Sequence, residues 1–171
     1  MIHSIIALGS NLGDRVDHLQ RAVAELSNLM WIRRASPIYE TEPMYVTEQP
    51  PFANAAILVA TDLGPLALLK ILKDTEKKVG RQPTERYGPR EIDLDLVYYG
   101  SAMYRMDDRL QVPHPRTPER WFVLQPMLDL NASLVLPGLG DVCTLVHATT
   151  DQSLNVRKLS NGLLPVSVHG R

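Results

Sequence analysis

The sequence predicts an α+β fold whose strands and helices follow the order β-α-β-β-α-β. Two observations support this prediction. Apolar residues recur at helical spacing in residues 14–27 and again from Pro65 to Val79. Short β-type runs stand before, between and after these two helices. This order is that of the ferredoxin-like split βαβ arrangement, an antiparallel sheet with helices packed on one face.

The first half of this order begins with the apolar run 2–8, which is typical of a buried strand. A glycine-bearing turn, 9–13, separates it from the first helix. That helix has one apolar face, made by Val16, Leu19, Val23 and Leu26. Residues 30–40 are compatible with a strand, although their pattern is mixed. Residues 53–62 form the next strand.

The second half begins with a helix that Pro65 opens and Gly80 ends. Residues 91–99 alternate in polarity, so we expect a strand there. Two polar, proline-bearing segments, 42–51 and 81–90, are predicted to be long mobile loops that could close over a substrate. A further helix is predicted near 118–129. The tail after about residue 140 has weak patterning, and we assign it no function.

Composition fits one domain spanning residues 1–171, which is long enough to bury a core. The formal net charge is −1, so no global basic field points to nucleic acid or a membrane surface. A single cysteine cannot form an internal disulfide. We find no signal-peptide pattern and no apolar run approaching the ~18 residues of a membrane span. We therefore expect a soluble cytoplasmic protein. We also expect a monomer that acts on small molecules.

The strand 91–99 carries the pattern that bears most directly on chemistry. Asp93 and Asp95 are two residues apart, so both carboxylates lie on one face of the strand. Two ionised carboxylates on one face repel each other, and a hard cation such as Mg²⁺ can offset this repulsion. Protein-bound Mg²⁺ is commonly coordinated by one or two carboxylates together with substrate phosphates. Arginines Arg86 and Arg90 lie just upstream and suit phosphate. The pattern favours an enzyme that handles ATP, while a solvated strand face is the simpler alternative.

Several nucleotide-binding motifs are absent, including the P-loop and the Gly-x-Gly-x-x-Gly turn. ATP would therefore have to be held by side chains and metal. Residues 81–120 contain seven arginines and no lysine, which suits phosphate recognition. A loop rich in proline and arginine is predicted after Gly100, and its cationic candidates are Arg109, His114, Arg116 and Arg120. Aromatic and amide candidates for a flat heteroaromatic ligand are Phe52, Tyr87, Phe122 and Asn54.

Residues 87–97 resemble the signature of the 6-hydroxymethyl-7,8-dihydropterin pyrophosphokinase family. The similarity extends over roughly residues 4–130. It includes further motifs in the same order: Ala7–Asp14, Tyr39-x-Thr41-x-Pro43, Gln49–Ala56, Val112–Pro115 and Glu119–Leu124. Several motifs in one order are more specific than any of them alone.

The resemblance implies transfer of the β,γ-pyrophosphoryl group of ATP to the hydroxymethyl group of a pterin, with release of AMP, in folate biosynthesis. It implies two Mg²⁺ ions on Asp93 and Asp95, and catalytic roles for these residues and for Arg81 and Arg90. The ATP-binding residues it implies are Glu76, Arg81, Tyr87, Arg90, Leu96, Arg109, His114 and Arg120. The pterin-binding residues it implies are Thr41, Glu42, Met44, Phe52, Asn54, Asp95 and Phe122.

Two alternatives belong to other functional classes. A metal-dependent hydrolase would use the same aspartates to activate water, and it would release phosphate or ADP without a pterin. An RNA-binding module shares the β-α-β-β-α-β order, but it needs exposed aromatic side chains on its central strands and a basic sheet face. The candidate strands carry Asp93, Asp95 and aliphatic residues instead, so we rank the RNA-binding module below the hydrolase.

Overall fold

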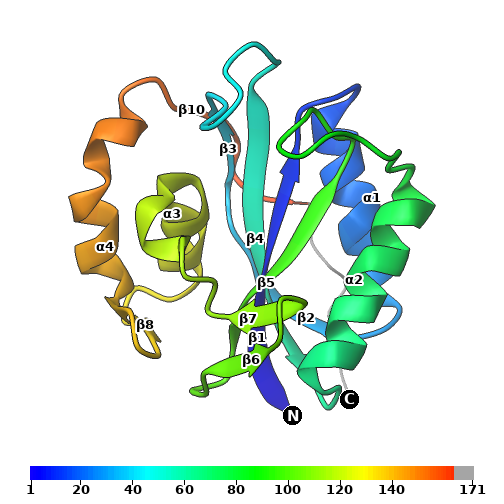
Figure 1. The fold of residues 1–171 in the computed structure, drawn as a ribbon, viewed down its shortest axis with the longest axis vertical. Helices are drawn as coiled ribbons and strands as arrows, with labels where there is room; N and C mark the ends of the chain where they lie inside the picture. Colours follow the sequence, from blue (N-terminus) through cyan, green and yellow to red (C-terminus); the bar gives the residue numbers. More distant parts are fainter. Residues whose placement is uncertain (164–171) are drawn as a thin grey trace.

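The computed structural model describes residues 1–163, and a six-stranded antiparallel sheet forms its centre (Figure 1). Residues 164–171, the end of the predicted domain 1–171, lie outside the described part. The strands run in the order β10-β3-β4-β1-β5, and β2 also pairs with β4. Their bounds are β1 (Ile2–Ser10), β2 (Trp31–Ala35), β3 (Ile38–Thr41), β4 (Phe52–Thr61), β5 (Asp93–Tyr99) and β10 (Arg157–Ser160).

The segment predicted as one mixed strand, 30–40, is two strands on the same side of β4. β2 pairs with residues 57–60 of β4, and β3 pairs with residues 52–54. Pro37 has no N–H to continue the ladder, so the strand breaks at this point. Ser36 bridges the break, because its hydroxyl accepts a hydrogen bond of 2.8 Å from the backbone N–H of Ala56. The strand order otherwise matches the predicted split βαβ arrangement.

The two predicted helices form on one face of the sheet. Asp14 caps α1 (Arg15–Ser27) by accepting from the N–H of Asp17 at 3.0 Å. Pro65 begins α2 (Pro65–Val79), and Gly80 ends it with a φ of 119°, in the left-handed region that glycine tolerates. Leu19 and Leu26 of α1 and Leu68 and Leu72 of α2 are buried in one apolar cluster with residues of β1, β4 and β5. This half of the fold agrees with the sequence prediction.

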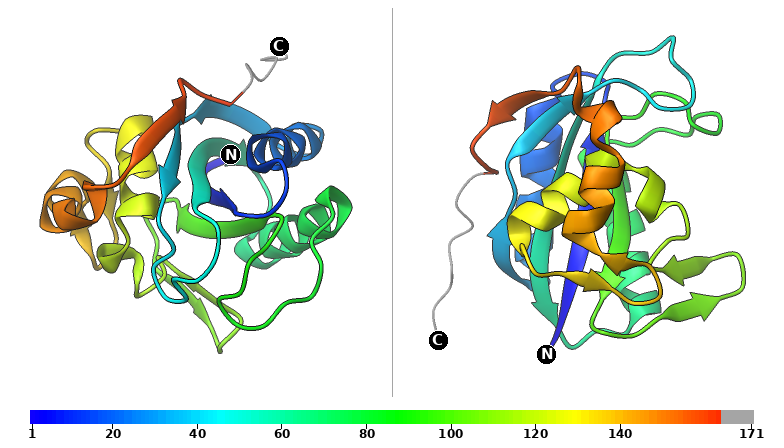
Figure 2. Two further views of the ribbon diagram at one scale, coloured as in Figure 1. Left: turned by 90° about the horizontal axis from the view of Figure 1, so that it is seen from above. Right: turned by 90° about the vertical axis from the view of Figure 1, so that its left-hand side faces the viewer.

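The opposite face of the sheet is covered as well, so the expectation of helices on one face is wrong. Two helices, α3 (Trp121–Leu130) and α4 (Val142–Ala148), lie on the side away from α1 and α2 (Figures 1 and 2). Both faces of β4 are apolar, and Ile5, Ala56 and Val97 contribute to a second buried cluster beneath α3. These helices cover the sheet face that an RNA-binding module would expose, which argues against that alternative.

Short elements complete the fold after Gly100. A hairpin forms in the segment predicted to be an irregular loop, between β6 (Tyr104–Met106) and β7 (Leu110–Val112). The remaining elements are η1 (Thr117–Glu119), β8 (Val135–Leu136), β9 (Gly140–Asp141) and η2 (Thr150–Ser153). The tail, to which the sequence analysis assigned no function, supplies α4 and the edge strand β10. Within residues 1–163, no helix is both long and apolar enough to cross a membrane.

Candidate active site

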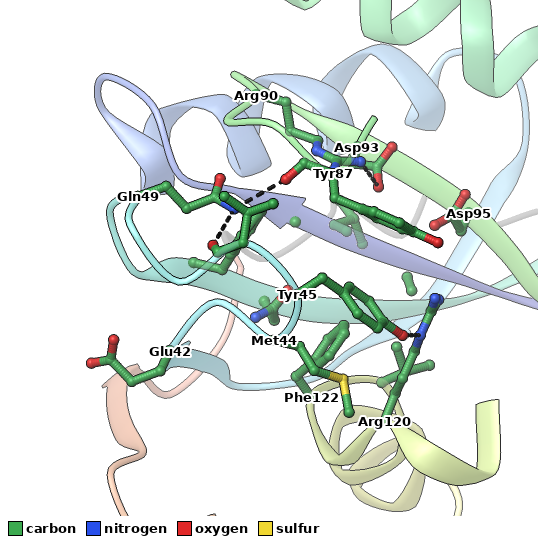
Figure 3. A pocket seen from close by; sticks show the side chains of 17 residues that line it. Glu42, Met44, Tyr45, Gln49, Tyr87, Arg90, Asp93, Asp95, Arg120 and Phe122 are labelled. Carbon is green, nitrogen blue, oxygen red and sulfur yellow. Dashed lines mark hydrogen bonds and ion pairs between the residues drawn. The ribbon is translucent and has the colours of Figure 1, made fainter. Parts of the chain in front are cut away.

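A cavity of about 280 Å³ opens where the ends of β1, β4 and β5 meet the start of α3 (Figure 3). The two predicted loops, 42–51 and 81–90, both contribute side chains to its wall. Ten of the predicted site residues line the cavity: Glu42, Met44, Phe52, Asn54, Tyr87, Arg90, Asp93, Asp95, Arg120 and Phe122. The fold therefore brings together residues that lie up to 80 positions apart in the sequence.

Asn11 ties the loops together at this end of the sheet. Its side-chain amide donates to Gln49 Oε1 at 2.9 Å and to the carbonyl of Pro50 at 3.1 Å. Its carbonyl oxygen accepts from the backbone N–H of Arg90 at 2.8 Å. Because Asn11 is buried, these bonds fix the base of both loops relative to β1.

Asp93 and Asp95 lie on the cavity side of β5, as their spacing predicts. Leu94 and Leu96 alternate with them and are buried on the side of α2. The charge of Asp93 raises the pKa of Asp95 to about 6, while the cations Lys73 and Arg120 act in the opposite direction. The Asp95 side chain is still 57% exposed, so its carboxylate remains open to a ligand.

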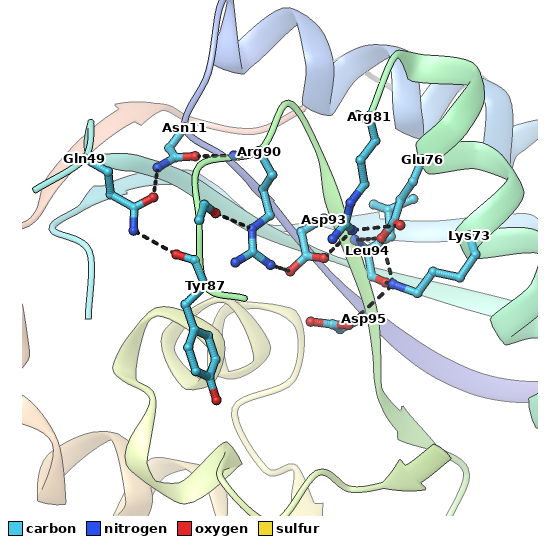
Figure 4. Close-up of polar contacts among 11 residues, drawn as sticks. Asn11, Gln49, Lys73, Glu76, Arg81, Tyr87, Arg90, Asp93, Leu94 and Asp95 are labelled. Atoms are coloured by element: carbon cyan, nitrogen blue, oxygen red, sulfur yellow. Dashed lines mark hydrogen bonds and ion pairs between the residues drawn. The ribbon is translucent and has the colours of Figure 1, made fainter. Parts of the chain in front are cut away.

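Asp93 differs from Asp95 because both of its oxygens already have cationic partners (Figure 4). Arg81 Nη1 lies 2.7 Å from Oδ1, and Arg90 Nη1 lies 3.0 Å from Oδ2. The same Arg81 nitrogen lies 2.8 Å from Glu76 Oε2. Two guanidinium groups thus converge on the carboxylate that faces the cavity, where they could also bind phosphate oxygens.

Glu76 and Lys73 hold α2 against the open edge of β5. Glu76 is only 3% exposed, and its Oε1 accepts from the N–H of Leu94 at 2.7 Å and from Lys73 Nζ at 2.8 Å. Lys73 Nζ also donates to the carbonyl of Leu94 at 3.2 Å and lies 4.0 Å from Asp95 Oδ1. The outward backbone groups of Leu94 are thereby satisfied without a further strand. Leu96, two residues along, directs its backbone groups the same way.

The other side of the cavity is aromatic. Phe52 and Phe122 both line it, together with Asn54. The Asn54 amide donates to Thr41 Oγ1 at 2.6 Å, which leaves its carbonyl oxygen available to a ligand. Gly9 permits this packing, because a Cβ there would lie 3.1 Å from Asn54 Oδ1. A flat ring with polar edges fits such a wall.

Six predicted residues do not line the cavity: Thr41, Glu76, Arg81, Leu96, Arg109 and His114. Thr41, Glu76 and Arg81 still act on it through Asn54 and Asp93, as described above. The Leu96 side chain is buried, so only its backbone could contact a ligand. Arg109 is exposed in the turn of the β6–β7 hairpin, where it pairs with Asp107 at 3.3 Å. His114 accepts from the backbone N–H of Arg116 at 3.1 Å, and burial lowers the pKa of His114.

Four residues that the structure brings to the site were not among the predicted site residues: Asn11, Gln49, Lys73 and Tyr45. A signal for Lys73 exists, because Lys73 and Glu76 continue the apolar stripe of α2 that Leu69 and Leu72 begin. Charged residues on the buried stripe of an amphipathic helix need partners there. The other three lie in irregular segments, where no periodicity shows which way a side chain points.

The carboxylate pair is chemically suited to Mg²⁺. Asp93 and Asp95 supply the oxygen ligands that Mg²⁺ prefers, and the charge of Asp93 raises the pKa of Asp95, as expected for two neighbouring carboxylates. Among residues 1–163, no third His, Cys, Asp or Glu joins them in a cluster of metal-ligand type. Water and phosphate oxygens commonly complete the coordination of Mg²⁺ at such sites.

Comparison with known proteins shows which family the chain resembles. Residues 5–132 match the family model described as 7,8-dihydro-6-hydroxymethylpterin-pyrophosphokinase (HPPK). A 2-amino-4-hydroxy-6-hydroxymethyldihydropteridine pyrophosphokinase of Haemophilus influenzae is 35% identical over 157 residues, covering 90% of this chain and 97% of that protein. A mitochondrial folate synthesis bifunctional protein of Arabidopsis thaliana is 46% identical over 132 residues, covering 77% of this chain. The chain spans only 24% of the length of that plant protein.

Solved structures share the fold. A Plasmodium falciparum HPPK-DHPS matches with a TM-score of 0.73 at 13% identity, over 89% of this chain and 46% of that one. An HPPK-DHPS in complex with substrates matches with a TM-score of 0.74 at 14% identity, over 89% of this chain and 44% of that one. These matches confirm the predicted ferredoxin-like fold. Because the family model covers most of its length, the chain belongs to the 7,8-dihydro-6-hydroxymethylpterin-pyrophosphokinase family.

Proposed function

We propose that the chain transfers the pyrophosphoryl group of ATP to the hydroxymethyl group of 6-hydroxymethyl-7,8-dihydropterin and releases AMP, a step of folate biosynthesis. Family membership supports the reaction class. The observation that carries the assignment is one cavity with a carboxylate–arginine wall at Asp93, Asp95 and Arg90 and an aromatic wall at Phe52 and Phe122. A polyphosphate and a flat heteroaromatic alcohol could therefore be held side by side.

Asp93 and Asp95 would hold the two Mg²⁺ ions of this proposal. When bound, Mg²⁺ would neutralise phosphate charge and favour ionisation of the pterin hydroxyl. Asp95 is accessible as it stands, whereas Asp93 must give up at least part of its contact with Arg81 or Arg90. Each guanidinium released from Asp93 gains phosphate oxygens as new partners, so the proposed site exchanges one set of ion pairs for another.

On the nucleotide side, Arg81, Arg90 and Arg120 would stabilise the charge that develops as the bond to AMP breaks. Glu76 and Lys73 contribute indirectly, by fixing β5 and the direction of Arg81. Leu96 would contribute the backbone N–H and C=O at the open strand edge, which suit the edge of a nucleobase. Tyr87, Arg109 and His114 complete the proposed ATP set.

On the pterin side, Phe52 and Phe122 would stack on the ring, and Asn54 would read its polar edge. Thr41 orients Asn54 through the 2.6 Å hydrogen bond between them. Glu42 and Met44, on the wall formed by loop 42–51, would offer backbone groups. Asp95, which also lines the cavity, would lie between the two substrates and contact both.

Nucleotide product analysis tests the proposal directly. ATP, Mg²⁺ and 6-hydroxymethyl-7,8-dihydropterin are supplied together, and each is then omitted in turn. AMP that forms only in the complete mixture supports pyrophosphoryl transfer, and Asp95→Ala should abolish most of it. ADP or phosphate formed without the pterin would favour the hydrolase alternative. The proposal also includes a monomeric state and a cytoplasmic location, and light scattering coupled to size exclusion tests the former.

A further inference from the structure

Two tyrosines join the loops that flank the cavity. Tyr45 belongs to loop 42–51, and Tyr87 belongs to the segment between α2 and β5. Their ring centroids are 4.6 Å apart with an interplanar angle of 31°, and both side chains line the cavity (Figure 3). An aromatic pair of this geometry stabilises the approach of two segments that share no strand pairing.

Two arginines from the segment before α3 bind the same pair. Arg120 Nε donates to the hydroxyl of Tyr45 at 3.1 Å, and Arg116 Nη1 donates to the hydroxyl of Tyr87 at 2.9 Å. The guanidinium carbons of Arg116 and Arg120 lie 5.3 and 5.6 Å from the centroid of the Tyr45 ring. We call Tyr45, Tyr87, Arg116 and Arg120 the tyrosine clasp, because three chain segments meet at it.

The backbone of Tyr87 is strained, so contacts between the loops must hold it in this conformation. Tyr87 has a φ of 61°, in the left-handed region that costs a bulky residue on the order of 1–3 kcal/mol. Such a conformation persists only where surrounding contacts determine it. Gln49 Nε2 donates to the carbonyl of Tyr87 at 3.0 Å, which gives the two loops a second link beside the stacked rings.

The atom that Arg120 uses decides what the contact can do. Arg120 donates through Nε, so its two terminal nitrogens stay free to form the forked contact that phosphate prefers. Arg120 and Asp95 both line the cavity. The Tyr45 hydroxyl therefore restrains the direction of Arg120 without occupying the nitrogens that would bind a polyphosphate.

We propose that Tyr45 is a positioning residue: its hydroxyl aims Arg120 at the polyphosphate, and its ring holds loop 81–90 closed over the cavity. The inference rests on the proposed function, since it assumes a polyphosphate beside Asp95. Tyr45 belongs to loop 42–51, which lines the proposed pterin side, yet its hydroxyl would act on nucleotide binding through Arg120. Removing the hydroxyl and removing the ring should therefore have different consequences.

Two substitutions separate the tasks. Tyr45→Phe keeps the ring and should weaken binding of a non-reacting α,β-methylene ATP analogue with Mg²⁺ by about threefold to tenfold, the value of one hydrogen bond. It should leave the KM for the pterin within twofold. Tyr45→Ala should also raise the KM for the pterin and lower kcat. In an Arg120→Met background, Tyr45→Phe should add nothing further.

The control is Tyr104→Phe, which removes a tyrosine hydroxyl in the β6–β7 hairpin outside the clasp. The proposal would be overturned if Tyr45→Phe bound the ATP analogue as tightly as the wild type, or more tightly. It would also be overturned if Tyr45→Phe changed kcat and both KM values equally. A readout independent of activity is the Arg120 Nε–H resonance, which should move in Tyr45→Phe and not in Tyr104→Phe. If wild-type protein made no AMP, the proposed function would fail while this resonance still tested the Tyr45–Arg120 contact.

Discussion

Replacing Glu76 by alanine tests whether this buried carboxylate holds the edge strand β5 against α2. The substitution removes three contacts: the N–H of Leu94 at 2.7 Å, Arg81 at 2.8 Å and Lys73 at 2.8 Å. Leu94 and Glu76 are both buried, so the N–H of Leu94 is left without an acceptor and without water. That loss alone costs about 1–3 kcal/mol.

The two ion pairs contribute less. Arg81 is 25% exposed and keeps Asp93 as a partner, so its share is about 0.5–1 kcal/mol. Lys73 is 41% exposed, and solvent screening reduces its share to almost nothing. The sum is about 3 kcal/mol, which for a chain of this length corresponds to a fall in Tm of roughly 6–12 °C.

Urea and thermal unfolding measure this change, and Glu25→Ala is the matched control. Glu25 also pairs with a lysine of α2, Lys78 at 3.3 Å, but both side chains are exposed. Its loss should cost less than about 0.5 kcal/mol, and the change in helix propensity is the same in both variants. Glu76→Gln keeps an acceptor for the N–H of Leu94, so its loss of unfolding free energy should lie between those of Glu76→Ala and Glu25→Ala. If Glu76→Ala were no more destabilising than Glu25→Ala, the edge-strand argument would be refuted.

Three further predictions concern the cavity. The charge of Asp93 raises the pKa of Asp95 from 3.8 to about 6, so the folded state binds this proton more tightly than the unfolded state. Ionisation of Asp95 therefore lowers stability as the pH rises from about 4 to about 6, and the full cost remains above pH 6. Asp95→Asn should therefore raise Tm at about pH 7.5 in metal-free buffer, and most of the difference should vanish by about pH 4. Gly9→Ala places a Cβ 3.1 Å from Asn54 Oδ1, so the KM for the pterin should rise about tenfold while nucleotide binding, measured by calorimetry, stays unchanged. Arg90→Ala should lower kcat/KM on the order of 10²-fold in steady-state assays, and an unchanged value would remove Arg90 from the phosphate site.

The sequence predicted those parts of the fold whose periodicity extends over many residues. The helices at 14–27 and from Pro65 to Val79, and the strand carrying Asp93 and Asp95, form close to the expected bounds. The break at Pro37 divides a strand that was predicted as one segment. The hairpin strands β6 and β7 have three residues each and α4 has seven, too short for a periodic pattern to identify them.

In the candidate site too, residues on a periodic strand were predictable from the sequence, whereas those on irregular loops were not. Residue type and spacing are sufficient to find the paired aspartates, because a period of two fixes their common face. They do not show that Arg81 and Arg90 both bind Asp93, since the two arginines lie in an irregular segment with no repeating direction. The direction of Tyr45 in loop 42–51 depends equally on tertiary contacts.

The cavity is assembled from two halves that have separate supports. α2 fixes the carboxylate half, because Lys73 and Glu76 anchor β5 and Arg81 follows the same helix to Asp93. β3, β4 and α3 fix the aromatic half. The halves meet through loops, at Asn11 and at the tyrosine clasp. Substitutions in α2 should therefore selectively alter the affinity for nucleotide and metal. Asn11→Ala should instead weaken binding of both proposed substrates, since it releases both loops at once.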